Sequence, residues 1–335
     1  MRRVIMVVLA LAGCVWPITS AVAGGSTVTA AQAAGTLQAD FDNDGADDLA
    51  VGVPFEDVGG SADAGAVSVL YGSGGGLTGA GSQQFTQVGS APETDDLFGA
   101  ALASGDFDND GFADLAVGAP FENVGATVDA GAVSVLYGSG AGLTTSGART
   151  FVQPVSAVEA DDAFGFSLGS GDFDNDGFAD LGVGAPFERV GATADAGAVS
   201  ALYGSAGAGL TTTGAQSFTQ VGGAVEPDDQ FGAALASGDF DRDGVADLGA
   251  GAPGENVGGV LGAGAVSALY GSAGGLTTSG GQLFTQNSAG VPGAAEEFDF
   301  FGDALAVGDT GPATTATSPS GNATSGAPRT ASTRR

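Results

Sequence analysis

A fixed period of 66 to 67 residues constrains the fold of this chain more than any other feature. An acidic segment with the pattern Asp-Phe-Asp-x-Asp-Gly recurs with spacings of 66, 66 and 67 residues, starting at Asp40, Asp106, Asp172 and Asp239. The sequence Leu-Tyr-Gly-Ser keeps the same period, starting at Leu70, Leu136, Leu202 and Leu269. A period of this length indicates repeated supersecondary units that share a core with their neighbours.

Within one period, short strands alternate with turns. The second period contains four segments that we expect to be strands, at residues 114–120, 131–139, 149–154 and 164–173. Turn-forming clusters such as Gly-Ser-Gly-Ala-Gly-Leu-Thr-Thr-Ser-Gly, at 138–147, separate them. No stretch keeps a capped 3.6-residue apolar period, so we expect almost no helix.

Four strands per period are typical of a β-propeller blade. A parallel β-helix is the alternative, but its turns are usually much shorter than this period. The segment before the acidic loop occurs five times and the other strands four times, so residues 36–309 hold four units and the start of a fifth. We therefore predict an all-β propeller of about four to five four-stranded antiparallel blades, arranged as an incomplete arc or a small ring.

The composition excludes several classes of chemistry. The chain has no His, and its 8 basic residues are all Arg, against 39 Asp plus Glu, for a formal net charge of −31. Without His or Lys it cannot form a Ser-His-Asp triad, a His zinc site, a Schiff base or a P-loop. Such an acidic chain is unsuited to binding nucleic acid and attracts cations. Paired carboxylates could still support glycoside hydrolysis, so that enzyme class stays open.

Both ends of the chain differ from the repeats. Residues 1–23 have the charged start, apolar run and small-x-small site of an export signal, and 24–35 read as a linker. Leu-Ala-Gly-Cys at 11–14 also resembles a lipoprotein box, which would attach the chain to a membrane through Cys14. Residues 310–335 have the composition of a disordered tail. We hypothesise that a frameshift there replaced a fifth acidic loop, which the nucleotide sequence would test.

The acidic loops have the chemistry of a calcium site. Counted from the first Asp, each loop carries Asp at positions 1, 3, 5 and 9, a Gly at position 6 for a sharp turn, and a backbone carbonyl at position 7. Hard oxygen ligands in this number and spacing suit Ca²⁺. The predicted ligands are Asp40, Asp42, Asp44, Ala46 and Asp48 in loop 1; Asp106, Asp108, Asp110, Phe112 and Asp114 in loop 2; Asp172, Asp174, Asp176, Phe178 and Asp180 in loop 3; and Asp239, Asp241, Asp243, Val245 and Asp247 in loop 4.

These loops differ from an EF-hand, which requires a bidentate Glu at position 12. Position 12 is an apolar strand residue here, so the Asp at position 9 must replace that ligand. One copy could be a solvated acidic turn, but four copies on one period favour four structural Ca²⁺ sites. Loop 4 has Arg242 at position 4, where the others have Asn, and we expect it to bind Ca²⁺ more weakly.

The combined motif resembles the FG-GAP repeat, which is found in the N-terminal β-propeller of integrin α chains and in bacterial surface proteins. Its hallmarks are Phe-Gly before the loop, at 98–99, 164–165, 231–232 and 301–302, and Gly-Ala-Pro after it, at 118–120, 184–186 and 251–253. The first unit has Gly-Val-Pro at 52–54 instead. The resemblance covers about residues 36–309 and implies a propeller with calcium loops on one face. It carries over no ligand-binding residues.

Other acids also recur, and we interpret them as solvated turn residues, with a shared acidic face as the alternative. They are Glu56, Glu122, Glu188 and Glu255 after the loop strand, and Asp95-Asp96, Asp161-Asp162, Asp228-Asp229 and Glu296-Glu297 before Phe-Gly.

Together these features predict an exported or cell-surface, calcium-stabilised module that binds an extracellular protein or glycan without catalysis. The alternatives are a carboxylate-based glycan hydrolase and a truncated remnant with no activity of its own. Contact with a membrane is expected only through a lipid anchor at Cys14.

Overall fold

The computed structural model describes residues 21–23 and 39–307 and consists of strands joined by turns and loops. Within these residues no helix occurs, and so none that could cross a membrane. Residues 1–20 of the predicted export signal, the linker at 24–35 and the tail at 310–335 lie outside the described residues. Export, lipidation of Cys14 and the frameshift therefore remain predictions.

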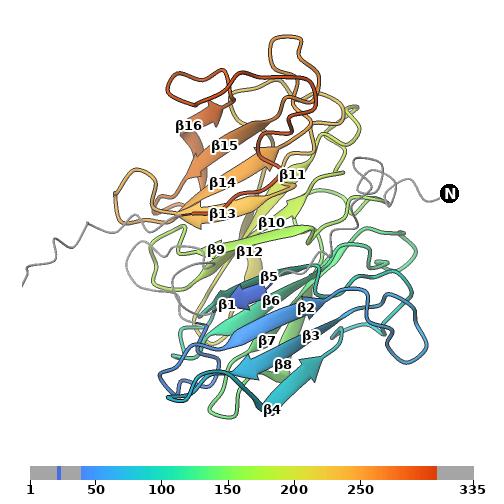
Figure 1. Cartoon of the computed structure of the whole chain (residues 1–335), viewed down its shortest axis with the longest axis vertical. Helices are drawn as coiled ribbons and strands as arrows, with labels where there is room; N and C mark the ends of the chain where they lie inside the picture. The colour runs from blue at the N-terminus through green and yellow to red at the C-terminus, as the bar shows by residue number, and fades with distance from the viewer. Residues whose placement is uncertain (1–20, 24–38, 308–335) are drawn as a thin grey trace, which may run out of the picture.

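The strands form four antiparallel sheets of four strands, each following the chain order (Figure 1). Sheet 1 contains β1 (Ala21–Ala23), β2 (Leu49–Val53), β3 (Ala66–Tyr71) and β4 (Thr78–Phe85). Sheet 2 contains β5 (Ala101–Gly105), β6 (Asp114–Ala119), β7 (Ala132–Tyr137) and β8 (Thr144–Phe151). Sheet 3 contains β9 (Ser167–Gly171), β10 (Asp180–Ala185), β11 (Ala198–Tyr203) and β12 (Thr211–Phe218). Sheet 4 contains β13 (Leu235–Gly238), β14 (Asp247–Ala252), β15 (Ala265–Tyr270) and β16 (Thr277–Phe284).

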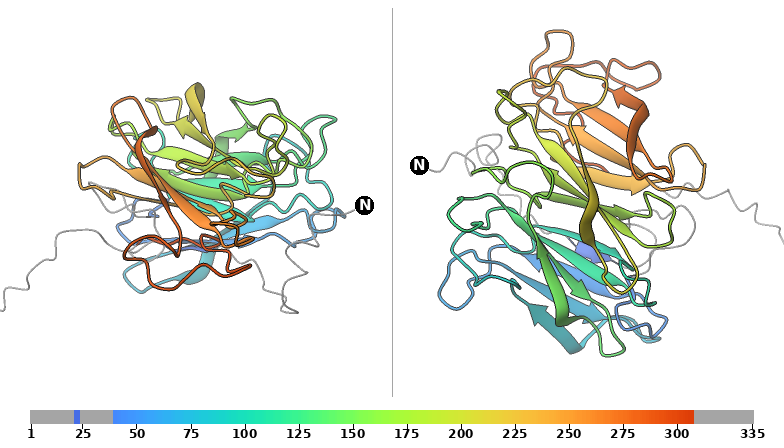
Figure 2. Two further views of the ribbon diagram at one scale, coloured as in Figure 1. Left: turned by 90° about the horizontal axis from the view of Figure 1, so that it is seen from above. Right: turned by 180° about the vertical axis from the view of Figure 1, so that it is seen from behind.

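The four sheets are arranged as successive propeller blades. The first strands of neighbouring sheets contact one another, β1 with β5, β5 with β9 and β9 with β13. The first and last sheets lie at opposite ends of the molecule in front and back views (Figures 1 and 2). The prediction of an all-β propeller with four-stranded antiparallel blades is confirmed, and the four blades form an arc.

The core is divided among the seams between blades. Three clusters of buried side chains each combine residues of two consecutive blades. In the first seam, Phe41 of the first acidic loop packs with Tyr71 of β3 and with Leu115 and Leu143 of the second blade. Since each blade buries its apolar face only against its neighbour, removing one blade exposes part of the next.

The Phe-Gly and Gly-Ala-Pro motifs meet at these seams. A Cβ on Gly184 of β10 would lie 2.1 Å from the carbonyl oxygen of Gly232, in the Phe-Gly pair of the next blade. Gly232 itself has a φ of +91°, which disfavours any other residue. The two glycines therefore allow the backbones of neighbouring blades to approach closely.

One strand begins earlier than predicted. The third predicted strand of the second period, at 149–154, is β8, the fourth strand of sheet 2, which runs from Thr144 to Phe151 and is longer. Its first residues were assigned to a turn because Thr, Ser and Gly favour turns. They pair with β7 across a register shift between Val135 and Tyr137, and such an irregularity has no clear sequence pattern.

A tyrosine at the end of the third strand links consecutive blades. The Tyr71 hydroxyl accepts a hydrogen bond from the Leu143 amide (2.8 Å), and the Tyr203 hydroxyl accepts one from the Leu276 amide (3.0 Å). Tyr203 also donates to Gln216 within its own blade. In the last blade, Tyr270 donates to Gln282 of β16 (2.9 Å), again within one blade.

We expect Tyr203→Phe to lower the free energy of unfolding by about 1–2 kcal/mol, because the buried Leu276 amide would lose its acceptor. Tyr270→Phe is the matched control, since its hydroxyl bonds only to a side chain of its own blade, and we expect about 0–0.5 kcal/mol. Urea titration of both variants measures the difference. Equal losses would contradict a role of the hydroxyl in joining blades.

Candidate metal sites

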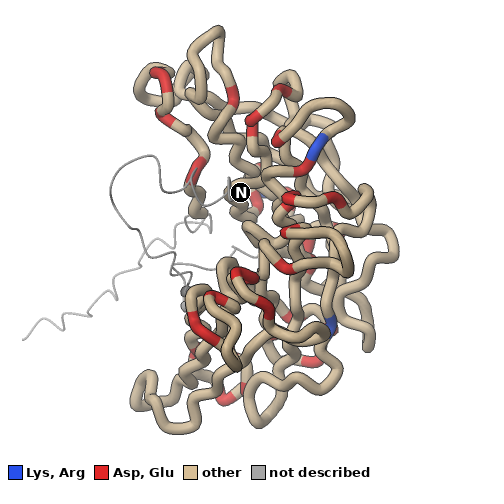
Figure 3. The backbone as a smooth tube through the Cα atoms, turned by 90° about the vertical axis from the view of Figure 1, so that its right-hand side faces the viewer, with Lys and Arg blue, Asp and Glu red and all other residues tan. Residues whose placement is uncertain are grey.

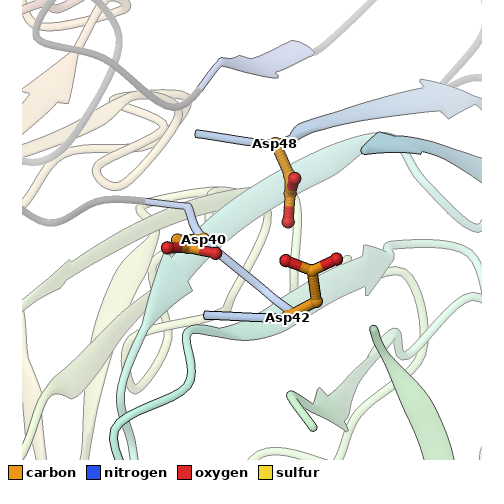
Figure 4. A group of neighbouring side chains, drawn as sticks. All are labelled: Asp40, Asp42 and Asp48. Atoms are coloured by element: carbon orange, nitrogen blue, oxygen red, sulfur yellow. The ribbon is translucent and has the colours of Figure 1, made fainter. Parts of the chain in front are cut away.

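Each acidic loop joins the first two strands of a blade and brings three carboxylates together. The members are positions 1, 3 and 9, and in every loop one oxygen from each lies within 4.8 Å of the other two. The groups are Asp40, Asp42 and Asp48; Asp106, Asp108 and Asp114; Asp172, Asp174 and Asp180; and Asp239, Asp241 and Asp247. Figure 4 shows the side chains of the first group pointing toward a common centre.

The Asp at position 9 is a buried structural link as well as a candidate ligand. Asp180 is 0% exposed at the start of β10. Its Oδ2 accepts from the amide of Phe173 in the loop (2.7 Å), and its Oδ1 accepts from the amide of Gly204 after β11 (2.9 Å). The same pair of bonds occurs at Asp48, Asp114 and Asp247. This side chain therefore fixes the loop to the end of the third strand.

Burial makes ionisation of the position-9 carboxylates costly. It raises the pKa of Asp114 and Asp180 to about 8 and the pKa of Asp48 and Asp247 to about 6. Backbone hydrogen bonds oppose the rise, and the negative charges at positions 1 and 3 add to it. Burial also raises the pKa of Asp174, to about 6. A bound cation would favour the ionised form at all three positions.

Positions 5 and 7 differ from the prediction, in which all five ligand positions of a loop contribute an oxygen to one centre. The converging groups contain positions 1, 3 and 9, whereas Asp176 at position 5 is exposed. Its Oδ1 accepts from the amide of Phe178 at position 7 (3.0 Å). The same bond forms between Asp44 and Ala46, Asp110 and Phe112, and Asp243 and Val245. Position 5 thus shapes the turn in this conformation, and its part in binding a cation stays a prediction.

The donor set fits a hard cation. Position 1 accepts from two amides of its own loop, as Asp172 does from Asp176 (3.1 Å) and Gly177 (3.0 Å), which orients the carboxylate. At position 3 of loop 2, a buried oxygen of Asp108 has no hydrogen-bond partner among the described residues. Three carboxylates with a free, buried oxygen atom suit Ca²⁺ better than a transition metal.

The turn at position 4 explains why three of the loops have Asn there. Asn43, Asn109 and Asn175 have φ between 54° and 57°, in the left-handed region where Asn is tolerated. Arg242 occupies the same conformation in loop 4, with a φ of 65°. All four loops thus have the same backbone conformation at position 4, and it is less favourable for Arg242 than for the three Asn residues.

We expect Arg242→Asn to raise the free energy of unfolding by about 0.5–1 kcal/mol, because Asn accepts the left-handed conformation more readily than Arg. Asn175→Arg, the reverse change in loop 3, should lower it by a similar amount. Chemical denaturation in a chelator measures both without a contribution from Ca²⁺. No difference between the two directions would contradict this explanation.

The loops also connect one blade to the next. The backbone carbonyl of Asp106 in loop 2 accepts from the amide of Ala179 in loop 3 (3.0 Å), and the carbonyl of Phe107 accepts from Ser205 (3.3 Å). Phe107 is 0% exposed, whereas Phe240 of loop 4 is 38% exposed at the open end of the arc. The last loop thus has less surrounding structure than the others, a second reason to expect weaker binding there.

Six of the twelve recurring acids outside the loops are buried, and for these the interpretation as solvated turn residues is wrong. The other six agree with it, since five are exposed and one is half-buried: Glu56, Asp161, Asp228, Glu296 and Glu297, and Asp95. Asp96, Asp162 and Asp229 are 0–1% exposed, and Glu122, Glu188 and Glu255 are 5–8% exposed. They lie at the other end of the strands from the metal loops. Figure 3 shows Asp and Glu on many loops and little positive charge beside them. The burial of these six acids could not be predicted, because acidic residues beside turns are usually solvated.

Comparison with known families agrees with this geometry. The family described as FG-GAP repeat matches the chain at residues 34–70, 98–136, 164–202 and 231–269. Each match contains one acidic loop and the two strands that follow it, and so covers most of a blade.

Curated relatives include integrin and phospholipase chains. Integrin alpha-3 of Mus musculus is 41% identical over 114 residues, which cover 32% of this chain and 9% of that protein. Phosphatidylinositol-glycan-specific phospholipase D of Rattus norvegicus is 34% identical over 171 residues (49% of this chain and 20% of that protein). Integrin alpha-7 of Homo sapiens is 36% identical over 153 residues (44% and 11%). The matched segments thus span a fifth or less of these relatives.

Among solved structures, the rhamnogalacturonan lyase PL11 of Bacillus licheniformis superposes with a TM-score of 0.37 and 14% identity, covering 69% of this chain and 40% of that chain. This likeness is too low to bear on fold or activity.

Proposed function

The chain belongs to the FG-GAP repeat proteins, and from this we propose that it is an exported, calcium-stabilised propeller that binds an extracellular protein or glycan without catalysis. The proposal that the chain binds Ca²⁺ rests on the convergence of three carboxylates in each of four loops. The proposal for a surface ligand rests on the family, since integrin α chains are among the relatives.

In this proposal the cation has a structural role. A Ca²⁺ ion would neutralise the carboxylates at positions 1, 3 and 9, while the two amide bonds of position 9 hold the loop against the third strand. Because loops 2 and 3 also bond to each other through their backbones, order in one loop supports the adjacent blade. The opposite end of the strands carries the connections between blades, such as 86–100, and loops on a rigid scaffold are common places for binding residues.

The enzyme alternative rests on a weaker observation. One relative is a phospholipase by name, but the matched segment covers 20% of that protein. A hydrolase that uses two carboxylates needs an acid and a base beside an accessible substrate. The converging carboxylates of the loops would be occupied by Ca²⁺ in our proposal, so a catalytic pair would have to lie elsewhere.

Binding of the mature chain to glycan arrays and to a panel of extracellular-matrix proteins, with Ca²⁺ and with EGTA, tests the proposal. We expect ligand binding that Ca²⁺ supports and that Asp174→Asn in loop 3 weakens. Asp57→Asn, at an exposed acid outside the metal loops, is the charge-matched control. Turnover of a polysaccharide that is lost on changing a carboxylate outside the loops would favour the hydrolase. Absence of binding and of turnover would favour the remnant.

A further inference from the structure

Three buried clusters, each of one Gln, one Asp and one Glu, lie at the opposite end of the strands from the metal loops. Each joins two blades: the Gln follows the fourth strand of one blade, and the Asp and Glu flank the first two strands of the next. The clusters are Gln87, Asp96 and Glu122; Gln153, Asp162 and Glu188; and Gln220, Asp229 and Glu255. All nine side chains are at most 8% exposed.

Half of each Asp carboxylate is engaged. Oδ2 of Asp96 accepts from the amide of Glu93 (2.6 Å), and Oδ2 of Asp229 accepts from that of Glu226 (2.6 Å). The carboxylates of Glu93 and Glu226 are themselves drawn outward, since they accept from the side-chain amides of Asn123 (2.7 Å) and Asn256 (3.0 Å). The Asp of each cluster interacts with the Glu of the same cluster, and the third acid is directed elsewhere.

The polar atoms that face the centre of each cluster have no donor from the surrounding structure. In the part of the chain that the structure describes, Oδ1 of Asp229, Oε2 of Glu255 and both amide atoms of Gln220 are buried in this way, as are the same atoms around Asp96. The Asp and Glu carboxyls can bond to each other only when one of them holds a proton. In the middle cluster the same holds for Gln153 and for Oε2 of Glu188. Buried polar groups without partners are rare, and the recurrence of an unpaired Gln amide and Glu oxygen in three seams points to a common ligand.

The Gln side chain is directed at the carboxylates. A Cβ on Gly223 would lie 2.7 Å from Nε2 of Gln220 and 3.5 Å from Oε1 of Glu255, so the two side chains converge on one point. Burial raises the pKa of Glu255, and the nearby Gln220 amide opposes that rise. Gln220 is 7% exposed, and a rotation of its amide presents its oxygen in place of its nitrogen.

The fourth unit shows what happens when the Glu is missing. Gln286 and Asp299 correspond to the Gln and Asp of the other units, and Glu296 donates its amide to Asp299 Oδ2 (3.0 Å) as expected. With the Gln286 amide turned to suit its neighbours, its nitrogen donates to the same oxygen of the exposed Asp299 (2.6 Å) and to the carbonyl of Ala294 (3.3 Å). Where a single carboxylate is present, the Gln side-chain amide therefore bonds to it. In the three clusters with both Asp and Glu, the Gln amide atoms and a Glu oxygen stay unpaired.

We propose that each of the three Gln–Asp–Glu clusters is a second kind of divalent-cation site, in which two carboxylates and the Gln amide oxygen hold Ca²⁺ or a similar hard cation between blades. Two buried carboxylates that are both ionised need compensating positive charge, and the chain has no Lys to supply it. The site would add a link between consecutive blades at the end of the strands opposite the metal loops.

Counting the bound ions tests this directly. The purified full chain is dialysed against Ca²⁺, and separately against Mg²⁺, at pH 7.5, and metal per chain is measured by atomic emission. With four loops and three clusters, we expect seven Ca²⁺ ions on the wild type. The double variant Asp229→Asn/Glu255→Gln keeps the shape and removes both charges, so it should bind one ion fewer. Asp299→Asn, in the unit without the Glu, should bind as many as the wild type.

The loop sites are tested separately, so the two proposals can fail independently. Asp174→Asn should also lose one ion, and an unchanged count there would contradict the loop sites alone. If Asp229→Asn/Glu255→Gln binds as many ions as the wild type with either metal, the cluster sites are wrong and the pair shares a proton instead. Asp96→Asn/Glu122→Gln repeats the test in the first seam. Should neither double variant fold, a wild-type count of four or fewer overturns the inference, and a higher count supports it.

Discussion

Asp180→Ala is expected to lower the free energy of unfolding by about 3–5 kcal/mol, since each of two buried amides would lose its acceptor at roughly 1–3 kcal/mol apiece. Those amides belong to Phe173 and Gly204, 2.7 and 2.9 Å from the Asp180 oxygens. The loss should be large with Ca²⁺ and also in a chelator, because the amide bonds exist without an ion.

Asp174→Ala, in the same loop, separates the metal from the scaffold. Asp174 accepts only from the amide of Asp176 (3.2 Å), within the exposed turn. In Ca²⁺ its removal should cost the stabilisation of one site, about 0.4–1.4 kcal/mol at 1 mM for a Kd of roughly 10⁻⁴–10⁻³ M. In EGTA it should be neutral or slightly stabilising, because repulsion by Asp176 and Asp172 is relieved.

Urea titrations of the wild type and both variants, each with Ca²⁺ and with EGTA, measure the change in the free energy of unfolding for each variant in each buffer. The loop is wrongly described if Asp174→Ala destabilises equally in both buffers. It is equally wrong if Asp180→Ala costs no more than a surface substitution.

The fold could be predicted from the sequence because every level of the pattern repeats. The 66- to 67-residue period predicts the repeated blades, and the alternation of apolar segments with Gly-rich turns predicts four strands in each blade. The early start of β8 was missed, because Thr144 to Gly147 have turn chemistry and become a strand only through pairing with β7. Tertiary contacts overrode local preference there.

The candidate sites were predictable in composition and less so in geometry. Alternating Asp residues indicated a cation loop, but Asp176 lies outside the converging group since its short side chain bonds to the amide of Phe178. The burial of Asp96 and Glu122 could not be read from one blade's sequence, because residues of the preceding blade help to cover them. When two segments far apart in the sequence form a seam, neither segment alone has a sequence pattern that indicates which of its residues are buried there.

The buried carboxylates at position 9 of the loops predict that the stability of the chain depends on pH and that Ca²⁺ changes this dependence. Burial raises the pKa of Asp114 and Asp180 to about 8 in the folded chain, above their ordinary value of 3.8. A raised pKa means that the folded state holds its proton more tightly than the unfolded state. Without metal, this contribution is complete below about pH 4 and is lost as the pH rises toward 8.

Calcium should largely cancel that dependence, since it binds the ionised carboxylates and replaces their protons. In EGTA we expect the melting temperature to fall from pH 5 to pH 8; in 1 mM Ca²⁺ most of the fall should disappear. With four sites at about 0.4–1.4 kcal/mol each, the calcium-induced rise near pH 8 should be roughly 3–20 °C. Near pH 5 it should be much smaller, because protons compete for the same oxygens.

Differential scanning calorimetry across this pH range, with Ca²⁺ and with EGTA, measures both dependences. Asp180→Asn is the informative variant, since it removes one titrating group while keeping the side-chain shape. It should reduce the fall in EGTA and also the gain from Ca²⁺, because one carboxylate is responsible for both. A calcium-induced rise that is the same at pH 5 and pH 8 would show that the ion does not bind these buried groups.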